Sequence, residues 1–343
     1  MSDCRAVVEG SLARYATLSR ETLLGGLPQQ DPTYHYALLA DYPGRSAKNL
    51  RPALCLATCG AFGGDIRRAL NSAVAAELFH NAFLIHDDIQ DNSEQRRGLP
   101  TLHTMHGVAI ALNVGAATNL LGLQRIMANR EILGSRLAWE IANETETMIR
   151  HSLEGQALEL GWIRDNVCDL SDEDYYRMCL KKTSWYTCIY PCRMGALIAE
   201  QPASCGSSLD RFAWYLGAAF QIQDDLLNLT GDYAVYGKEI LGDLWEGKRT
   251  LMVIHLLQTL DEPDATRLRT FLRLRRDQRT ERQVRWVLDS MLEACSLEHA
   301  EQCAHELADA ARNEIDAALD GTSESDDRNF LKSMPEYVIT RDC

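Results

Sequence analysis

The sequence lacks an excess of basic residues. Its 35 Lys and Arg residues are outnumbered by 49 Asp and Glu residues, which gives a formal net charge of −14. Binding to the backbone of duplex nucleic acid needs a basic surface that displaces counterions. The composition therefore argues against a nucleic-acid partner, and any anionic ligand must be bound by a local cluster of bases.

The sequence also lacks alternating β-branched runs and any repeat of fixed period. Apolar residues recur at three- and four-residue spacing instead, as in residues 70–88 and 301–319, a pattern typical of helices. This predicts an all-α protein of about ten helices separated by Gly-, Pro-, Ser- and Asp-rich breaks. One large core suffices at this length, so we expect a single domain over residues 1–343, with residues 1–40 as an N-terminal helical segment. The breaks are expected at 40–46, 62–65, 96–101, 200–208, 230–248, 261–264 and 320–327.

No run is both long and purely apolar. Residues 107–124 carry no charge, but they include Asn113, Thr118, Asn119 and Gln124. Polar groups at this density favour a helix buried in protein over one that faces lipid. We therefore expect no transmembrane segment.

No disulfide framework or secretory signal is apparent. The eleven cysteines lack the spacing of small disulfide-rich domains, and the first ten residues include acids where a signal peptide is basic and apolar. We expect a cytoplasmic protein with reduced thiols. Cys55 with Cys59, and Cys188 with Cys192, lie four residues apart in apolar runs. Because each pair offers only two ligands of a four-ligand zinc site, we expect these cysteines to pack in the core.

Two acidic clusters each follow a long apolar segment, HDDIQD at 86–91 and QDDLLN at 223–228. On a helix, Asp87 and Asp91 lie one turn apart on one face, and His80 falls within about 20° of the same line. Taken alone, one pair of aspartates is more typical of a solvated helix end. The second pair favours inward-facing acids, which an apolar helix tolerates only with a neutralising cation. Oxygen ligands suit Mg²⁺, which shares its ligands with substrate phosphates.

Basic residues accompany both clusters. Each one alone is typical of a protein surface, but Arg and Lys side chains are also the usual partners of phosphate oxygens. Acids for a metal and bases for phosphate together predict a site for diphosphates carried on Mg²⁺. The bases concerned are Lys48, Arg51, Arg96, Arg97, Lys181, Lys182, Lys238 and Lys248.

The strings DDIQDNSEQRRGLPTLHTMHG (87–107) and FQIQDDLLN (220–228), the latter followed by GK and GDLWEGKRT, resemble the two aspartate-rich motifs of the trans-isoprenyl diphosphate synthases. The resemblance extends roughly over residues 48–250, and this ordered combination is far more specific than one motif. Within the family the chain resembles geranylgeranyl diphosphate synthases of the animal and fungal type, which share the continuation DNS..RRG.P and an Asn that closes the second motif.

The resemblance implies the isoprenoid synthase fold, a single large helical bundle around a deep central cavity, in a homodimer that uses three Mg²⁺ ions. Residues that match metal-binding positions are Asp87, Asp88, Asp91, Asp224, Asp225 and Asn228. Residues that match contacts to the allylic diphosphate are Arg96, Lys182 and Lys238, and Lys248 is also expected to bind substrate. Lys48, Arg51, His80 and Arg97 match the isopentenyl diphosphate site, and Thr183 and Gln221 match the reacting end. Catalytic roles are expected for Asp87, Asp88, Lys182, Asp224 and Lys238.

Three departures from the family pattern keep the essential charges. Ser46 and Ala47 replace a Gly-Gly pair, Glu159 replaces an Asp, and Asn228 replaces the third Asp of the commonest second motif. Product length depends on the residues before Asp87, where Ala82 is small and the ring of Phe83 is a candidate floor of the tunnel. Phe83 is equally typical of core packing. A geranylgeranyl product is expected, with farnesyl or longer (geranylfarnesyl) products as alternatives.

Three other functions are compatible with parts of the pattern. A class I terpene cyclase has an aspartate-rich motif, but it resembles a different second motif and lacks an isopentenyl-binding group. A di-iron bundle needs paired Glu-x-x-His motifs, and only Glu77 with His80 offers one. A non-catalytic partner subunit would be signalled by loss of the first-motif aspartates, which are intact.

Overall fold

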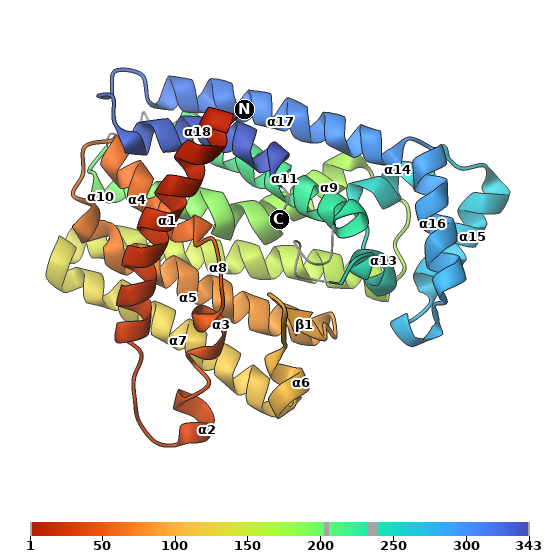
Figure 1. The fold of residues 1–343 in the computed structure, drawn as a ribbon, viewed down its shortest axis with the longest axis horizontal. Helices are drawn as coiled ribbons and strands as arrows, with labels where there is room; N and C mark the ends of the chain where they lie inside the picture. Colours follow the sequence, from red (N-terminus) through yellow and green to blue (C-terminus); the bar gives the residue numbers. More distant parts are fainter. Residues whose placement is uncertain (1, 202–205, 232–238, 342–343) are drawn as a thin grey trace.

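The computed structural model describes residues 2–201, 206–231 and 239–341 (Figure 1). Regular structure there is almost entirely helical, as the apolar spacing predicts. The main helices are α1 (Ser2–Gly25), α4 (Leu50–Ala61), α5 (Ile66–Gln90), α7 (Val108–Leu133), α8 (Ser135–Arg164), α9 (Asp172–Cys179), the π-helix η1 (Leu180–Ile189), α10 (Tyr190–Ile198), α11 (Gly206–Thr230), α14 (Leu251–Thr259), α15 (Glu262–Arg273), α16 (Glu281–Glu293), α17 (Ser296–Ala318) and α18 (Asp326–Thr340). Short elements are α2 (Thr33–Tyr36), α3 (Asp41–Gly44), α6 (Leu102–His106), α13 (Gly242–Glu246), η3 (Arg276–Gln278), β1 (Gln95–Arg96) and β2 (Leu99–Pro100).

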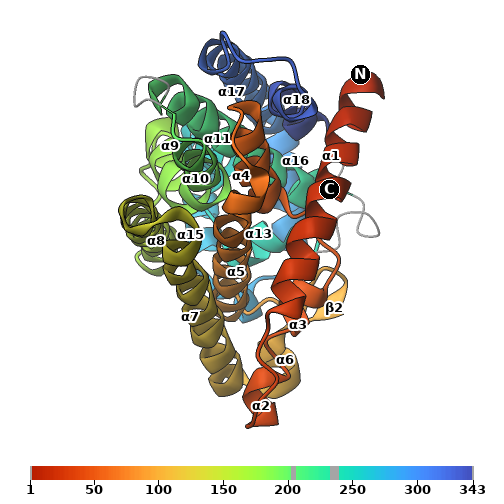
Figure 2. The ribbon, with the colours of Figure 1, turned by 90° about the vertical axis from the view of Figure 1, so that its left-hand side faces the viewer.

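The long helices lie roughly alongside one another, and α1 crosses them steeply (Figures 1 and 2). α5 packs along α7, while α11 packs along both α17 and η1. α15 and α16 form a lobe at the end of the molecule away from α4 and α10. The arrangement is the helical bundle expected from the sequence.

Two apolar clusters meet along α11. The main core includes Phe79, Trp185 and Phe212, and the second core includes Ile222 and Phe271. The N-terminal half of α11 therefore packs in the main core and its C-terminal half in the second. The acidic pair of α11 lies in the C-terminal half of the helix, between Ile222 and Leu226 of the second core.

Several predicted breaks coincide with N-caps. The Asp65 side chain accepts a hydrogen bond from the Arg67 amide at the start of α5. Asp261 and Ser325 cap α15 and α18 in the same way. Short polar side chains satisfy amides that the first helical turn leaves without partners, and these breaks are therefore placed correctly.

The predicted break at 96–101 contains a small hairpin instead of a loop. Arg96 pairs with Leu99 across an antiparallel register, and the two turn residues, Arg97 and Gly98, have φ of 56° and 73°. A two-residue turn with both φ positive matches the twist of paired strands. The hairpin gives the adjacent side chains Arg96 and Arg97 different surroundings.

The uncharged run 107–124 forms most of α7, and within the described chain only one face of this helix is buried in protein. One face of α7 packs on α5 through buried residues such as Ala111 and Val114. The other face exposes large apolar side chains, namely Val108, Ile110, Leu112, Leu120, Leu123 and Met127. Among the helices in the described part of the chain, none combines the length and apolarity needed to cross a membrane.

The paired cysteines lie in the core as predicted. Cys55, Cys59, Cys188 and Cys192 are free thiols with no exposed surface, and all four belong to the main core. They therefore act as small apolar side chains.

Candidate active site

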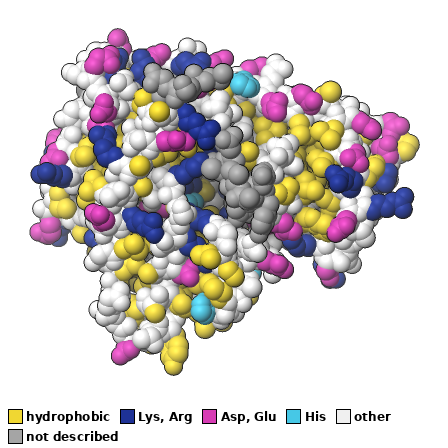
Figure 3. All heavy atoms as spheres, in the orientation of Figure 1, with side chains coloured by type: hydrophobic (Ala, Val, Ile, Leu, Met, Phe, Trp, Pro, Cys, Tyr) yellow, Lys and Arg dark blue, Asp and Glu magenta, His cyan; other side chains and the backbone are white. Residues whose placement is uncertain are grey.

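A cavity of about 340 Å³ is lined by residues of α5, α8, α9, η1, α11 and α13. Carboxylates and bases face each other across it. On the side of the molecule drawn in Figure 3, Lys and Arg side chains gather near the middle despite the net negative charge. The acidic lining residues include Asp87, Asp91, Glu159, Asp224, Asp225, Asp243 and Glu246, and the basic ones include Arg96, Lys182 and Lys248.

Three carboxylates from α5 and α8 converge in this cavity. Oxygens of Asp87, Asp91 and Glu159 all lie within 4.8 Å of one another. Asp91 is buried, and burial raises the pKa of its carboxyl although nearby Lys248 opposes the shift. A group of oxygen ligands without His or Cys suits a hard cation such as Mg²⁺. The residues present therefore fit the metal that the sequence predicts.

Two partly buried lysines neutralise these acids. Lys182 Nζ forms an ion pair with Glu159 and lies 3.6 Å from Asp87 Oδ1. Lys248 Nζ lies 2.8 Å from Asp91 Oδ2 and 2.8 Å from Glu246 Oε2. Positive and negative side chains therefore lie in contact with one another in the cavity. In this arrangement a metal ion can replace a lysine beside a carboxylate, and the released lysine can then bind a phosphate.

The π-helix η1 presents Lys182 to the cavity. A Cβ on Gly155 of α8 would overlap the backbone of Lys182, and a Cβ on Gly217 of α11 would overlap Ser184. Both glycines thus allow neighbouring helices to approach η1 closely. π-Helical turns are rare and often occur at functional sites. The sequence does not reveal this irregularity, because the apolar spacing of residues 180–189 differs little from that of an α-helix.

Asp88 points away from the other aspartates. It has no exposed surface and accepts hydrogen bonds from Arg96, whose Nε lies 2.8 Å from Oδ1, and from the Tyr42 hydroxyl. Arg96 is itself buried, and its Nη2 lies 3.6 Å from Asp87 Oδ2. Asp88 therefore holds the guanidinium of Arg96 close to Asp87, one of the three converging carboxylates.

The acidic cluster of α11 is held by a hydrogen-bond chain. Thr183 Oγ1 donates to Gln221 Oε1 at 2.6 Å, and Gln221 Nε2 donates to Asp225 Oδ1 at 2.6 Å. Tyr175 donates to Asp225 Oδ2 at 2.8 Å. Burial, followed by the charge of Asp243, raises the pKa of Asp225 well above its ordinary value. A cation in the cavity would relieve this repulsion.

The other two α11 residues have different partners. Asp224 Oδ1 lies 3.5 Å from Nη2 of Arg341, near the C-terminal end of the described chain. Asn228 Nδ2 donates to the Glu239 carbonyl at 3.2 Å, and its Oδ1 accepts from the Asp243 amide at 3.0 Å. Asn228 thereby fixes the segment that leads into α13 and its acidic residues.

A second basic group lies beside the cavity. Arg97 Nη2 is 3.4 Å from His80 Nε2, and the Arg51 guanidinium lies 4.5 Å from the centre of the Tyr186 ring. Burial, reinforced by neighbouring arginines, lowers the pKa of Arg97, whereas burial raises the pKa of Glu77 beside them. Close arginines that repel one another form a receptive site for an anion.

The family model described as Polyprenyl synthetase matches residues 33–291. The chain belongs to the polyprenyl synthetase family. It is 29% identical to the geranylgeranyl pyrophosphate synthase of Geoglobus acetivorans over 95% of this chain and 97% of that protein. It is 30% identical to the geranylgeranyl diphosphate synthase of Sulfolobus acidocaldarius over 86% and 87% of the two chains. The structure of geranylgeranyl pyrophosphate synthetase from Pyrococcus horikoshii superposes with a TM-score of 0.85 at 28% identity, covering 97% of this chain and 99% of that chain.

The protein is an enzyme that transfers prenyl groups, and its all-α fold is that of its structural relatives, as predicted. The structure brings most predicted site residues into the cavity lining, namely Asp87, Asp91, Arg96, Lys182, Thr183, Gln221, Asp224, Asp225, Asn228 and Lys248. Arg51, His80 and Arg97 lie together beside it, and Lys48 Nζ lies 5.4 Å from the centre of the Tyr337 ring. Lys238 lies outside the described residues.

The candidate product-length residues immediately precede Leu84, which lines the cavity. Ala82 is fully buried. The Phe83 ring packs edge-on against Tyr186, with centroids 5.4 Å apart, and Tyr186 itself lines the cavity together with Leu84. A pair of rings, rather than Phe83 alone, therefore stands at this end of the cavity.

Several polar residues of the site are not predicted by the sequence, among them Tyr42, Tyr175, Arg341 and Glu246. The tyrosines and the arginine lie far along the chain from the motifs, and nothing in their local sequence marks them. Glu246 could have been found, because it immediately precedes Gly247 and Lys248 in the matched string GDLWEGKRT.

Proposed function

We propose that the protein is a Mg²⁺-dependent prenyltransferase. It condenses isopentenyl diphosphate head-to-tail with dimethylallyl, geranyl or farnesyl diphosphate, giving all-trans geranylgeranyl diphosphate. The observation that carries this proposal is the cavity in which Asp87, Asp91 and Glu159 converge opposite the bases Lys182, Lys248 and Arg96. That set fits a diphosphate bound through metal ions, and the names of the relatives agree with the product.

Asp87 and Asp91, with Asp224 and Asp225 across the cavity, would hold Mg²⁺, and we extend the proposal to three ions. When bound there, Mg²⁺ would stabilise negative charge on the leaving diphosphate. Lys182, Lys248 and Arg96 would bind the phosphate oxygens of the allylic substrate, together with Lys238. We propose that Asp88 orients Arg96 and that Asn228 orients the segment before α13. The side-chain oxygens of Asp88 and Asn228 already accept hydrogen bonds.

Isopentenyl diphosphate would bind the second basic group, Lys48, Arg51, His80 and Arg97. Arg97 and Arg96 follow one another in the hairpin, so one rigid turn would orient both diphosphates. This places the double bond of one substrate close to the allylic carbon of the other, and such proximity supplies much of the rate enhancement in reactions of two substrates.

The reaction then follows from charge and exclusion of water. The allylic carbon–oxygen bond breaks and its electron pair leaves with the diphosphate. The isopentenyl double bond supplies the pair for the new carbon–carbon bond, and loss of a proton to the released diphosphate restores a double bond. Thr183, Gln221 and Tyr186 line the cavity, and we assign them to the reacting end, where a positive charge would benefit from dipoles and an aromatic ring.

The length of the product would be set by the Phe83–Tyr186 pair. Substituting Phe83→Ala removes the lower ring and should shift the main product to a longer chain. A product distribution identical to that of the wild-type protein would show that Phe83 only packs the core.

A homodimer is the further proposal that the surface supports. The exposed apolar face of α7 continues to Trp139 of α8, which is 69% exposed, and large apolar patches mark interaction sites. The cytoplasmic location and the single domain stay predictions. The relatives named above come from archaea, so they do not support the narrower resemblance to the animal and fungal type.

The proposed function is tested by incubating purified protein with Mg²⁺, isopentenyl diphosphate and each allylic starter, followed by chromatography of the dephosphorylated alcohols. Geranylgeraniol as the main product supports the proposal. Farnesol or geranylfarnesol as the main product would change the proposed product length. A cyclic hydrocarbon would indicate a terpene cyclase instead of a synthase. No elongated product from any starter would indicate a non-catalytic partner subunit.

A further inference from the structure

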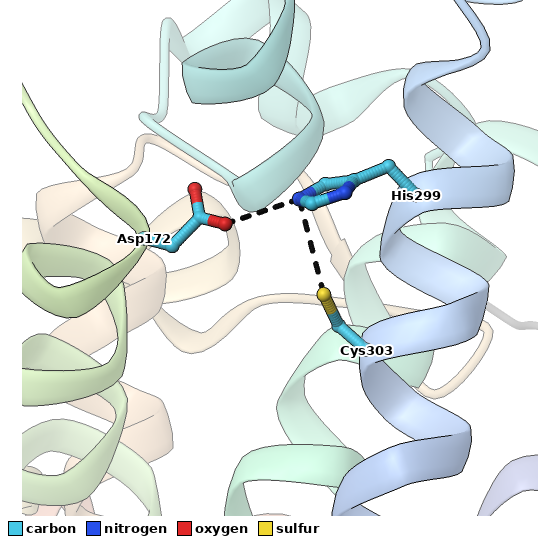
Figure 4. A group of neighbouring side chains, drawn as sticks. All are labelled: Asp172, His299 and Cys303. Carbon is cyan, nitrogen blue, oxygen red and sulfur yellow. Dashed lines mark hydrogen bonds and ion pairs between the residues drawn. The ribbon is translucent and has the colours of Figure 1, made fainter.

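A second group of potential metal ligands lies between α9 and α17. Asp172 begins α9, and His299 and Cys303 lie one turn apart on α17. Figure 4 shows the three side chains pointing toward one another from the two helices. Their ligand atoms all lie within 4.8 Å of one another. None of the three is among the described residues that line the active-site cavity.

Both contacts in this group involve the same atom, His299 Nε2. Asp172 Oδ2 lies 3.1 Å from it and Cys303 Sγ lies 3.8 Å from it. A Cys-His-Asp catalytic arrangement needs the acid and the thiol on opposite nitrogens of the ring, so this group does not form one. Convergence on a single nitrogen instead leaves three donor atoms around one point.

The separations match those of ligands around one small ion. With metal–ligand distances of about 2.0–2.3 Å and tetrahedral angles, nitrogen and oxygen should be about 3.4 Å apart and nitrogen and sulfur about 3.6 Å apart. The observed distances, 3.1 and 3.8 Å, lie within a few tenths of these values. The other oxygen of Asp172, Oδ1, is buried and accepts no hydrogen bond from the described residues.

Neighbouring side chains support this geometry. The His255 ring stacks on His299, with centroids 4.4 Å apart and 22° between the planes, and His255 Nδ1 is 3.0 Å from Ser296 Oγ. Outer partners of this kind orient metal ligands and tune their affinity.

We propose that Asp172, His299 and Cys303 form a binding site for a borderline divalent metal of the Zn²⁺ class, separate from the oxygen-lined cavity. One nitrogen, one sulfur and one oxygen ligand suit Zn²⁺ and leave a fourth position for water. Binding releases the thiol proton of Cys303 to solvent. The ion would tie the start of α9 to α17, and α9 also carries Tyr175, which donates to Asp225 in the cavity.

The probe for this site is Co²⁺, which substitutes for Zn²⁺ and gives a thiolate charge-transfer band only when sulfur is a ligand. Full-length reduced protein, stripped with a chelator and then given excess Mg²⁺ to occupy oxygen sites, is titrated with Co²⁺ and then with Zn²⁺. A saturable charge-transfer band with tetrahedral visible absorption, abolished by Zn²⁺, is expected. Absence of the band from the wild-type protein would overturn the proposal.

Matched variants identify the ligands. Cys303→Ser should abolish the band, and His299→Gln and Asp172→Asn should each weaken Co²⁺ binding more than about 100-fold, since losing an outer partner alone costs 10–100-fold. Cys295→Ser and His305→Gln alter exposed residues of the same region and should leave the titration unchanged. A band that persists in Cys303→Ser, or that disappears in Cys295→Ser, would refute the assignment. If Cys303→Ser or His299→Gln misfolds, the Co²⁺ affinity of Asp172→Asn still tests it.

Discussion

Substituting Asp88→Asn distinguishes a residue that positions Arg96 from one that binds metal. Asp88 has no exposed surface, and Arg96 is 7% exposed. Removing one partner of a buried ion pair costs about 3–5 kcal/mol, because the other charge stays buried. The remaining charge of Asp87, whose Oδ2 lies 3.6 Å from Arg96 Nη2, partly compensates, so a loss near the lower end, about 3 kcal/mol, is expected.

Asp87→Asn is the matched control, since it makes the same chemical change one residue earlier on a half-buried side chain. Urea unfolding should show a loss of stability for Asp88→Asn and less than about 1 kcal/mol for Asp87→Asn, in keeping with exposed ion pairs. In steady-state kinetics the two variants should differ in which parameter changes. The Mg²⁺ concentration for half-maximal rate rises strongly for Asp87→Asn, whereas Asp88→Asn lowers kcat/KM about 100-fold through misplacement of Arg96. Unchanged stability of Asp88→Asn together with an equal shift in Mg²⁺ dependence would refute the reasoning.

Three further predictions concern the packing of η1, a buried acid and the exposed face of α7. Gly155→Ala should destabilise the protein by about 1–3 kcal/mol and lower kcat, because the added Cβ overlaps the Lys182 backbone. Gly161→Ala, in open space on the same helix, is the control and should stabilise the protein by about 0.5–1 kcal/mol. Equal effects of the two substitutions in urea unfolding would contradict this prediction. Burial raises the pKa of Glu246 to about 8 from an ordinary 4.5, so the protonated carboxyl stabilises the metal-free fold at low pH and this contribution is lost as the pH rises toward 8. Thermal unfolding in chelator should therefore show a smaller loss of stability between about pH 5 and 8 for Glu246→Gln, and parallel curves for the two proteins would be the adverse result. Met127→Glu, on a side chain 75% exposed, should convert the proposed dimer to a monomer in sedimentation velocity, with Glu131→Gln as a control on the same helix.

The sequence was sufficient for the helical fold and for the acidic site because both depend on local periodicity. Apolar spacing located α5 and α11, and the one-turn spacing of Asp87 and Asp91 correctly placed them on a common face. It could not show that Asp88 points elsewhere, because that depends on Tyr42 and on the hairpin turn at Arg97 and Gly98.

Contacts between distant segments account for the rest. Asp172 and His299 are 127 residues apart, and no local pattern joins them. The sequence leaves open whether the apolar face of α7 meets its own core or a partner subunit, because an uncharged helix has the same pattern in both cases. The π-helical form of η1 depends on close approach of Gly155 and Gly217 from two neighbouring helices.

The central claim is that the carboxylates of α5 and α11 hold a diphosphate through Mg²⁺. A crystal structure with Mg²⁺ and a non-hydrolysable allylic diphosphate analogue tests it most directly. The account predicts that Asp87 and Asp91 ligate metal on one side and Asp224 on the other. Lys248 should leave Asp91 for a phosphate oxygen, while Asp88 stays bound to Arg96 and Tyr42. A diphosphate bound away from these carboxylates, or Asp88 released from Arg96 to ligate metal, would contradict the account.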